Sequence, residues 1–300
     1  MNTLCYIFMF LLGTILGSYF GVLGIRIPRG ENTFNSRSHC EKCGHILKWY
    51  ELIPVLSFFF QGGKCRVCKT KLSIMYPLLE LGTGLLFLVS YHSYGFSYNL
   101  IISLTLVSLF MLVIVSDITY LIIPDRFIIV SSIIIFLIKA LDVGILQALI
   151  QVGYGVLCFG FMYLIMFLGN YLFKKESLGG ADIKLMFLVG LTLDPMLAIV
   201  VLFLSSIIAL PVSLIILVKN KEHVIPYGPF IMLGLLIVNF TKLNIKEIFL
   251  KFINFLINYF FLVKLLKCDI IYPCLGGDYF EKYNFIQRRS KRITYQSQKR

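Results

Sequence analysis

The sequence predicts an all-α polytopic membrane protein with about eight transmembrane helices and a small cytoplasmic loop domain. Of its 300 residues, 58% are hydrophobic and only 14% are charged, and the mean hydropathy is +0.86. These values lie outside the range of soluble globular proteins. A helix that crosses a bilayer needs about 20 mostly apolar residues. The segments that qualify are 4–24, 74–92, 98–116, 127–141, 145–168, 183–195, 196–218 and 227–241.

The first segment is expected to be a retained helix. It lacks the basic start and the small-residue cleavage site that mark a secretory signal peptide. Two later segments, 127–141 and 183–195, are short for complete spans, so each is alternatively a re-entrant segment or part of a merged helix. The sequence therefore divides into a first transmembrane helix (1–25), a cytoplasmic loop domain (26–73), a helical membrane core (74–241) and a C-terminal extension (242–300).

The basic residues indicate the topology. Cytoplasmic loops carry an excess of lysine and arginine, and the loop 26–73 contains Arg26, Arg29, Arg37, Lys42, Lys48, Lys64, Arg66, Lys69 and Lys71. The segments 91–99 and 192–196 have neither residue and are expected outside, as is the N-terminus. The net charge of +13 is therefore interpreted as topology and attraction to anionic lipid head groups, and nucleic acid is not expected as a partner.

Two cysteine pairs in the loop 26–73 predict a metal site. "HCEKC" at 39–43 and "KCRVC" at 64–68 place Cys40, Cys43, Cys65 and Cys68 at the spacing of a zinc ribbon. Four thiolates close a tetrahedral structural site, and a reducing cytoplasm disfavours disulfides. A pair of redox CxxC motifs and unligated thiols are the alternatives. The other four cysteines show no ligand spacing.

Three acids are expected at the cytoplasmic face. Asp117 closes one apolar segment, Asp125 opens the next, and Asp182 precedes another. Each is compatible with a helix-capping role, because a carboxylate in the first turn complements the positive end of the helix dipole. Acids at membrane depth are costly, so they mark function or lie at a hydrated interface. Two carboxylates that share one proton divide into a base and an acid, as hydrolysis by an activated water requires.

Five segments in order resemble the bacterial type IV prepilin peptidases, membrane aspartic proteases of the GxGD type that also N-methylate their product. They are "LGSYFGVLGIRIPRGEN", "SRSHCEKCGHILKWYELIPVLSFFFQGGKCRVCKTKLSIMYPLLELGTG", "DITYLIIPD", "LGGADIKL" and "VIPYGPFIMLG". The resemblance covers residues 5–240 and makes 74–241 the peptidase core.

The resemblance implies that Asp117 and Asp182 are catalytic, with Asp125, Gly179, Gly180 and Lys184 in supporting roles. It implies a structural zinc ion, S-adenosylmethionine as methyl donor, and Glu80 as a candidate for the methyl-transfer site. Prepilins or pseudopilins are the implied substrates, cut at the cytoplasmic face of the bacterial inner membrane, with membrane lipids as the other partners. The sequence sets no oligomeric state.

Three positions depart from the family pattern. Ala181 stands where the GxGD motif has its second glycine, Glu41 replaces a proline, and Gly21 replaces an asparagine. Two alternative functions follow from other interpretations of these residues. The chain is alternatively a degenerate zinc-ribbon assembly protein without peptidase activity. An ion-coupled transporter also uses membrane acids, but its site favours the bilayer midplane and repeated halves, and no repeat is evident.

The C-terminal extension has no counterpart in that family. The apolar stretch 247–267 is a candidate ninth helix that returns the basic tail to the cytoplasm. An amphipathic helix on the outer surface is the alternative. "LGGDYF" at 275–280 echoes the second acid motif but is not followed by an apolar segment, so Asp278 is assigned no catalytic role.

Overall fold

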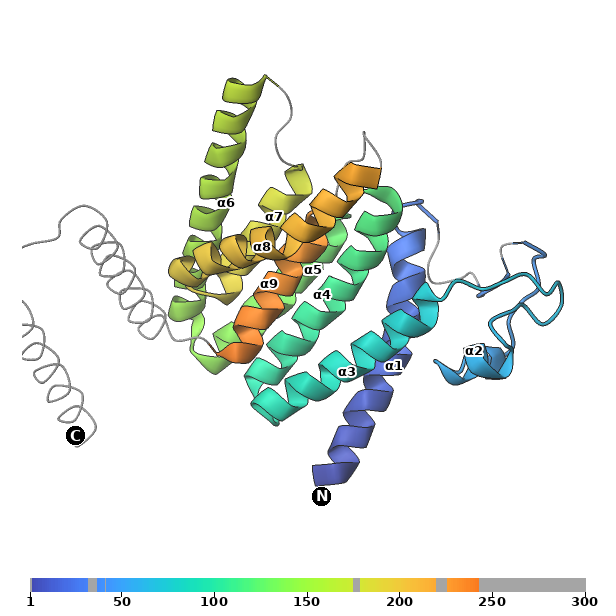
Figure 1. Ribbon diagram of the computed structural model, residues 1–300. Coiled ribbons are helices and arrows are strands. Elements are labelled where there is room, and N and C mark those ends of the chain that lie inside the picture. Colours follow the sequence, from blue (N-terminus) through green and yellow to red (C-terminus); the bar gives the residue numbers. More distant parts are fainter. Residues whose placement is uncertain (1, 32–36, 41, 175–178, 220–225, 243–300) are drawn as a thin grey trace, which may run out of the picture. The chain divides into compact units, whose positions relative to one another are not determined.

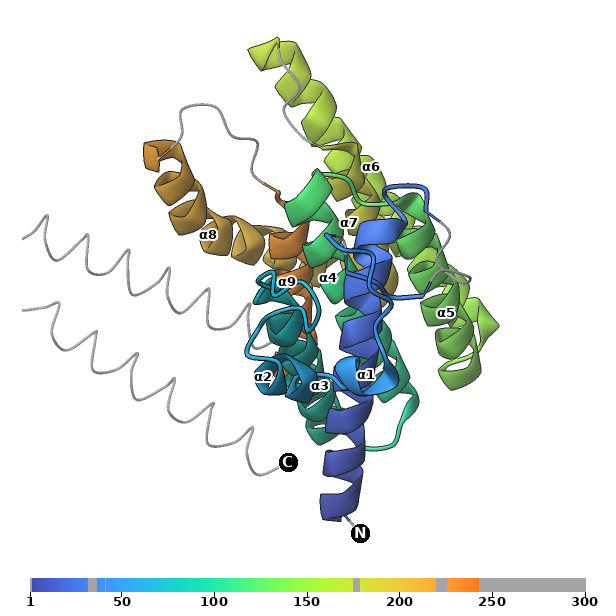
Figure 2. The ribbon, with the colours of Figure 1, turned by 90° about the vertical axis from the view of Figure 1, so that its right-hand side faces the viewer.

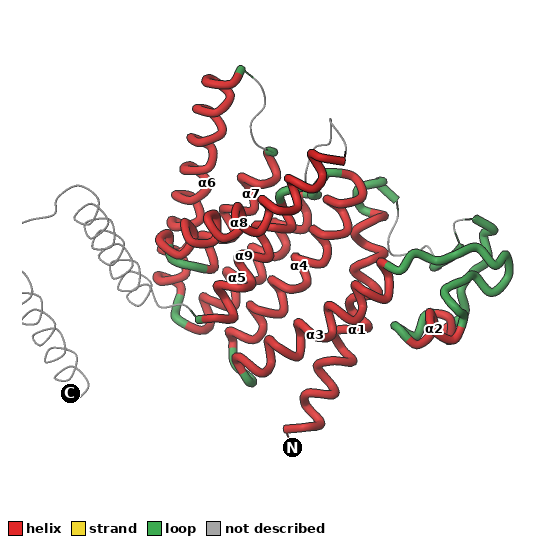
Figure 3. The backbone as a smooth tube through the Cα atoms, in the orientation of Figure 1, coloured by secondary structure: helices red, strands yellow, loops and turns green. Residues whose placement is uncertain are grey.

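The computed structural model describes residues 2–31, 37–40, 42–174, 179–219 and 226–242, and these consist of helices and loops without a strand (Figures 1 and 3). The helices are α1 (Asn2–Arg26), α2 (Leu56–Phe60), α3 (Met75–Tyr94), α4 (Tyr98–Tyr120), α5 (Asp125–Asp142), α6 (Ile145–Phe173), α7 (Gly180–Thr192), α8 (Pro195–Lys219) and α9 (Gly228–Thr241), with a short 3-10 helix at Trp49–Glu51.

Each of the eight apolar segments expected from the sequence coincides with one of these helices. Four of them, α1, α4, α6 and α8, are long and apolar enough to cross a membrane. The predicted all-α, multi-pass membrane class is therefore confirmed in its coarse form. The predicted end of the segment 183–195 was three residues too late. Helix α7 ends at Thr192, and α8 begins as a separate helix at Pro195.

Helix α4 is central to the packing. It contacts α1, α3, α5 and α9 (Figure 2), and Leu106, Val107, Leu109 and Val113 on it are fully buried. The burial continues to Ser116 and Asp117, whereas Ile118 in the last turn is exposed. A functional side chain on the buried face of this end is therefore shielded from the surroundings by protein.

Glycines bring α1 and α3 into close contact. A Cβ atom added at Gly13 would lie 2.8 Å from the Cα of Gly84, and one at Gly17 would lie 2.6 Å from the Thr83 hydroxyl. Small residues let membrane helices approach closely, and van der Waals packing then holds them together. The same stripe continues to Gly21, where an added Cβ would meet nothing closer than 3.7 Å.

The space available for a Cβ atom differs between Gly17 and Gly21, and this difference predicts how each alanine substitution affects stability. Gly17→Ala is expected to destabilise the protein by roughly 1–3 kcal/mol, because the new methyl group overlaps the Thr83 side chain. Gly21→Ala is the matched control and is expected to change little. Thermal unfolding of both variants in one detergent measures the difference, and equal midpoints would contradict this account of the contact.

The candidate ninth helix at 247–267, the basic tail, Asp278, Cys268 and Cys274 lie outside the described residues. So do Glu41 and nearly all of the extension 242–300.

Candidate active site and metal centre

Asp117 occupies the last turn of α4. The helix ends after Tyr120 because Leu121 adopts a left-handed conformation, with φ of 55°, and its N–H donates to the Asp117 carbonyl at 2.9 Å. Pro124 follows shortly and begins the next helix as its N-cap. Although it lies near the helix end, the Asp117 side chain is buried, with 6% of the residue exposed.

Asp182 occupies the first turn of α7 and is 8% exposed. Its N–H donates to the Gly179 carbonyl at 3.1 Å, and the Gly179 backbone also hydrogen-bonds its carboxylate. The carboxylates of Asp117 and Asp182 lie close enough to interact electrostatically. The structure thus brings together two buried acids from opposite ends of different helices.

Ala181 fits this turn without strain. It is the second residue of α7 and does not have a positive φ, and Gly179 at the N-cap is extended, with φ of −69° and ψ of 135°. Only a φ in the left-handed region favours glycine over alanine. The methyl group that departs from the GxGD pattern is therefore compatible with the position of Asp182.

Asp125 differs from the other two acids. Its side chain is 57% exposed and lies 2.7 Å from the Lys184 ammonium. The pair lies at the rim of a groove of about 620 Å³ between α5, α6 and α7, whose lining is otherwise almost wholly apolar. Because an exposed ion pair contributes little stability, the pair is better placed to orient α5 against α7 than to hold the fold together.

Gly228 completes the surroundings of Asp117, a role that the sequence interpretation missed. It begins α9, and its backbone N–H interacts with the Asp117 carboxylate. A Cβ atom at this position would lie 2.9 Å from the Asp117 carboxylate oxygen and 2.6 Å from Ile123. Tyr227 anchors the same segment, since its hydroxyl hydrogen-bonds the hydroxyls of Ser205 and Ser206 on α8 at 2.8 and 2.9 Å. The motif "VIPYGPF" carries the signal, a glycine at a helix start.

Replacing Gly228 tests this contact. Gly228→Ala is expected to lower the leader cleavage that the family resemblance implies by roughly ten-fold or more, because the methyl group displaces the Asp117 carboxylate, and small misplacements of reacting groups are costly. Gly153→Ala in α6 is the control, since nothing lies within 4 Å of an added Cβ there. Cleavage is measured by the mobility shift of a tagged precursor, normalised to membrane-inserted protein. Unchanged cleavage in Gly228→Ala would remove Gly228 from the site.

The four loop cysteines converge on one point. Their sulfur atoms all lie within 4.8 Å of one another, with Cys40 and Cys68 sulfurs 3.8 Å apart and Cys43 and Cys65 sulfurs 4.0 Å apart. Sulfurs around a tetrahedral zinc ion with Zn–S bonds of about 2.3 Å are separated by about 3.8 Å. The Thr70 hydroxyl hydrogen-bonds the Cys68 sulfur and lowers the pKa of that thiol to about 6. The donor set therefore fits the metal that the spacing predicts.

Two equivalent backbone turns position these thiols. In the first, Cys40 N–H donates to the His45 carbonyl at 2.9 Å, and in the second, Cys65 N–H donates to the Thr70 carbonyl at 2.8 Å. Gly44 and Lys69 occupy matching places with φ of 70° and 59°. Each turn is closed by an isolated β-bridge, His39 with Ile46 and Lys64 with Lys71. These paired turns present two sulfurs each to the same centre.

Glu80 joins the loop to the membrane core. It is buried on α3, and its carboxylate accepts the Val55 N–H at 2.6 Å and a hydrogen bond from Ser18 of α1. Val55 itself has a positive φ of 64°. The carboxylate therefore holds a strained loop residue in place beside α1 and α3.

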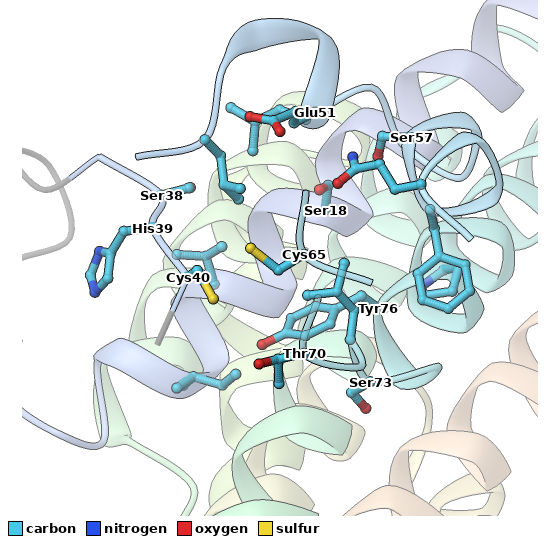
Figure 4. Close-up of a pocket in the computed structure, with 18 of the residues that line it drawn as sticks. Ser18, Ser38, His39, Cys40, Glu51, Ser57, Cys65, Thr70, Ser73 and Tyr76 are labelled. Carbon is cyan, nitrogen blue, oxygen red and sulfur yellow. The ribbon is translucent and has the colours of Figure 1, made fainter. Parts of the chain in front are cut away.

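A cavity of about 510 Å³ lies between the loop, α1 and α3 (Figure 4). Glu80, Cys40 and Cys65 are among its lining residues, as is Glu51, which sequence analysis did not single out. One Glu51 oxygen accepts the Lys48 N–H at 2.8 Å and lies 3.2 Å from a His45 ring nitrogen. The hydrogen bond from Lys48 holds the pKa of Glu51 below its usual range, and the His45 ring acts in the same direction. The other Glu51 oxygen is buried and has no hydrogen-bond partner.

Comparisons with known proteins place the chain among similar sequences. Residues 11–94 match the bacterial peptidase A24 N-terminal domain, and residues 104–214 match the type IV leader peptidase family. Three similar proteins are each named prepilin leader peptidase/N-methyltransferase. That of Myxococcus xanthus is 33% identical over 217 residues, covering 71% of this chain and 64% of the relative. That of Bacillus subtilis is 32% identical over 249 residues, covering 81% and 97%, and that of Vibrio cholerae is 30% identical over 253 residues, covering 79% and 97%.

No solved structure matches the chain. The two family matches together span more than half of the sequence, and they include both acid motifs and all four loop cysteines. A relative that is 32% identical is matched over 97% of its own length. The chain belongs to the type IV leader peptidase family.

Proposed function

We propose that this protein cuts the short leader from type IV prepilins or pseudopilins at the cytoplasmic membrane face and then N-methylates the new N-terminus. The observation that carries the peptidase assignment is the pair of buried carboxylates, Asp117 and Asp182, within electrostatic range of each other. The relatives named prepilin leader peptidase/N-methyltransferase support both activities. Neither a transporter nor an inactive assembly protein is favoured.

In the proposed reaction, Asp117 and Asp182 hold a water molecule between them. One carboxylate, ionised, takes a proton from the water as its oxygen attacks the scissile carbonyl carbon. The other, protonated, donates to the developing oxyanion and then to the leaving amine. Because like charges at close range cannot both ionise easily, a buried pair favours this single-proton state.

The surrounding residues position this pair. Gly228 leaves room beside the Asp117 carboxylate, and the Asp125–Lys184 ion pair links the helix that follows Asp117 to the helix that begins before Asp182. Gly179 lies beside the Asp182 carboxylate, and α7 begins at Gly180. The apolar groove beside the ion pair suits the apolar stem of a membrane-anchored precursor.

Zinc is proposed as a structural ion held by Cys40, Cys43, Cys65 and Cys68. A site closed by four thiolates leaves no open position for a substrate, so its contribution is to fold the loop. Glu80 is proposed to serve methyl transfer by holding the loop through Val55, because its carboxylate is occupied by hydrogen bonds. When bound, S-adenosylmethionine supplies the methyl group.

The proposed topology has eight spans in the bacterial inner membrane, with the N-terminus outside and the loop 26–73 in the cytoplasm. The distribution of lysine and arginine supports it. Anionic lipid head groups are the proposed partners of the basic segments that flank the spans.

Co-expression with a tagged prepilin, followed by mass spectrometry of the prepilin N-terminus, tests the two activities separately. The expected product lacks its leader and carries one added methyl group. A trimmed but unmethylated product would refute methyl transfer alone. An intact leader would favour the assembly-protein alternative.

A further inference from the structure

The loop that carries the cysteines exposes large apolar side chains between its two cysteine turns. Five of them, between 38% and 87% exposed, are Trp49, Ile53, Leu56, Phe59 and Phe60. None of the five lines the cavity between the loop, α1 and α3. Surfaces in water rarely carry large apolar patches, and those that do occur mark contacts with a protein or a membrane. The segment 49–60 therefore needs a partner.

The short helix α2 within this segment has two different sides. Ser57 and Phe58 line the cavity. Leu56, Phe59 and Phe60 do not, and each of them is more than half exposed. Their spacing of i, i+3 and i+4 is that of one apolar stripe along a helix. The loop and the core thus cover one side of α2 and leave its apolar side uncovered.

Contacts with the membrane helices show the depth of this segment. The Val55 N–H donates to the Glu80 carboxylate at 2.6 Å, and the same carboxylate accepts a hydrogen bond from Ser18. Ser18 belongs to a stretch of α1 that is long and apolar enough to span a membrane, and it lies about two turns, or roughly 12 Å, before the helix end at Arg26. Figures 1 and 2 accordingly show α2 level with the turns of α1 and α3, not beyond the C-terminal end of α1.

The charges around the segment fit a lipid surface. The stretch 52–63 contains no charged residue, whereas Lys48 precedes it and Lys64 and Arg66 follow it. All three basic residues are exposed, and the adjacent acid, Glu51, is buried. Interfacial anchors have this composition, because their basic residues bind anionic head groups while tryptophan, phenylalanine and leucine enter the boundary of the acyl chains.

We propose that the segment 49–60 is an interfacial membrane anchor, with its five exposed apolar side chains inserted among the lipids of the cytoplasmic leaflet. Backbone groups at this depth must be hydrogen-bonded within the protein. The Ser57 N–H donates to the Ile53 carbonyl at 3.0 Å, and the Phe59 N–H donates at 3.3 Å to a carbonyl of the same segment. The anchor holds the zinc turns against the bilayer beside α1 and α3. It goes beyond the proposed function and depends on neither activity.

Trp49 is the only tryptophan in the chain, so its fluorescence reports the position of the anchor without a mutation. The full, zinc-loaded chain is reconstituted in vesicles of phosphatidylcholine and phosphatidylglycerol. Part of the phosphatidylcholine carries bromine, a contact quencher of indole, either near the head group or near the chain ends. Bromine near the head group is expected to reduce Trp49 emission by roughly half or more, and bromine near the chain ends by less, because interfacial segments enter the bilayer by only about 5–10 Å.

Two single-tryptophan variants built on Trp49→Phe give the matched comparison. Phe60→Trp places the indole at the most exposed position of α2 and is expected to be quenched by brominated lipid at least as strongly as Trp49. Val67→Trp is the control, because Val67 is 61% exposed in the second cysteine turn, next to Arg66. Its indole is expected to be quenched by acrylamide from water and not by brominated lipid. Zinc content verifies that each variant keeps the loop folded.

The lipid assignment has two results that overturn it. Trp49 and the Phe60→Trp indole are quenched by acrylamide but not by brominated lipid if the segment lies in water. If brominated lipid has no effect and added purified prepilin shifts both emissions to shorter wavelength, the segment binds protein instead of lipid.

A double variant, Phe59→Ser with Phe60→Ser, tests the part that α2 plays in the anchor. It is expected to lower the quenching of Trp49 by brominated lipid at least roughly two-fold, since the two largest exposed apolar groups of α2 are lost, and to leave the zinc content unchanged. Wild-type quenching in the zinc-loaded double variant would exclude α2 from the anchor and contradict the proposal. None of these measurements uses leader cleavage or methylation, so their failure is distinct from a failure of the proposed function.

Discussion

Asp117→Asn and Asp182→Asn, made one at a time, are each expected to abolish leader cleavage while the protein remains inserted in the membrane. Each substitution keeps the size of the side chain but removes one of the two groups that exchange protons with water and substrate. Removal of a single member of a catalytic unit lowers the rate by roughly 10⁴-fold or more. Cleavage of a co-expressed tagged precursor measures the loss, and immunoblots of the membrane fraction verify insertion.

Asp125→Asn is the matched control for the acid pair. Asp125 is a neighbouring acid, but it is exposed and paired with Lys184, so its replacement is expected to reduce cleavage much less. Near wild-type cleavage in either Asp117→Asn or Asp182→Asn would show that the two-aspartate mechanism is wrong for this chain. A loss in Asp125→Asn as large as that in the other two variants would move Asp125 into the reacting group.

The purified protein is expected to contain one zinc ion per chain, and the Cys40→Ser, Cys65→Ser double variant is expected to contain none. The double variant leaves only one thiolate in each turn, Cys43 and Cys68, so two of the four tetrahedral ligands are missing. Because structural zinc binding is coupled to folding, the loop 40–68 should also become more sensitive to protease. Elemental analysis by mass spectrometry measures the metal.

Cys158→Ser is the control for the metal prediction. Cys158 is buried on α6, away from the cysteine cluster, so its replacement is expected to leave the zinc content at one per chain. An unchanged metal content in the double variant would refute the ligand assignment. Zinc loss without any change in loop proteolysis would refute the structural role of the ion.

Local pattern in the sequence was sufficient to predict the helices and the pairing of the loop cysteines in two similar turns. A run of apolar residues selects a membrane helix wherever it occurs, and all eight expected segments are helical. The two CxxC turns form from bonds between residues close in sequence, so their spacing alone predicts how each presents its thiols. The acid motifs likewise identify Asp117 and Asp182 through short stretches of sequence.

Tertiary structure decided which of these pieces meet. The sequence left helix capping as an alternative for every acid, and only the packing of the helices buries Asp117 and Asp182 together while Asp125 stays exposed. Gly228 reaches Asp117 from α9, and Glu51 and Glu80 come to the same cavity from the loop and α3. The physical reason is the sequence distance between the residues that interact. Periodicity and motif spacing report interactions between residues a few positions apart. Burial and close approach join segments far apart in the chain, and they depend on how the side chains of different helices fill the space between them.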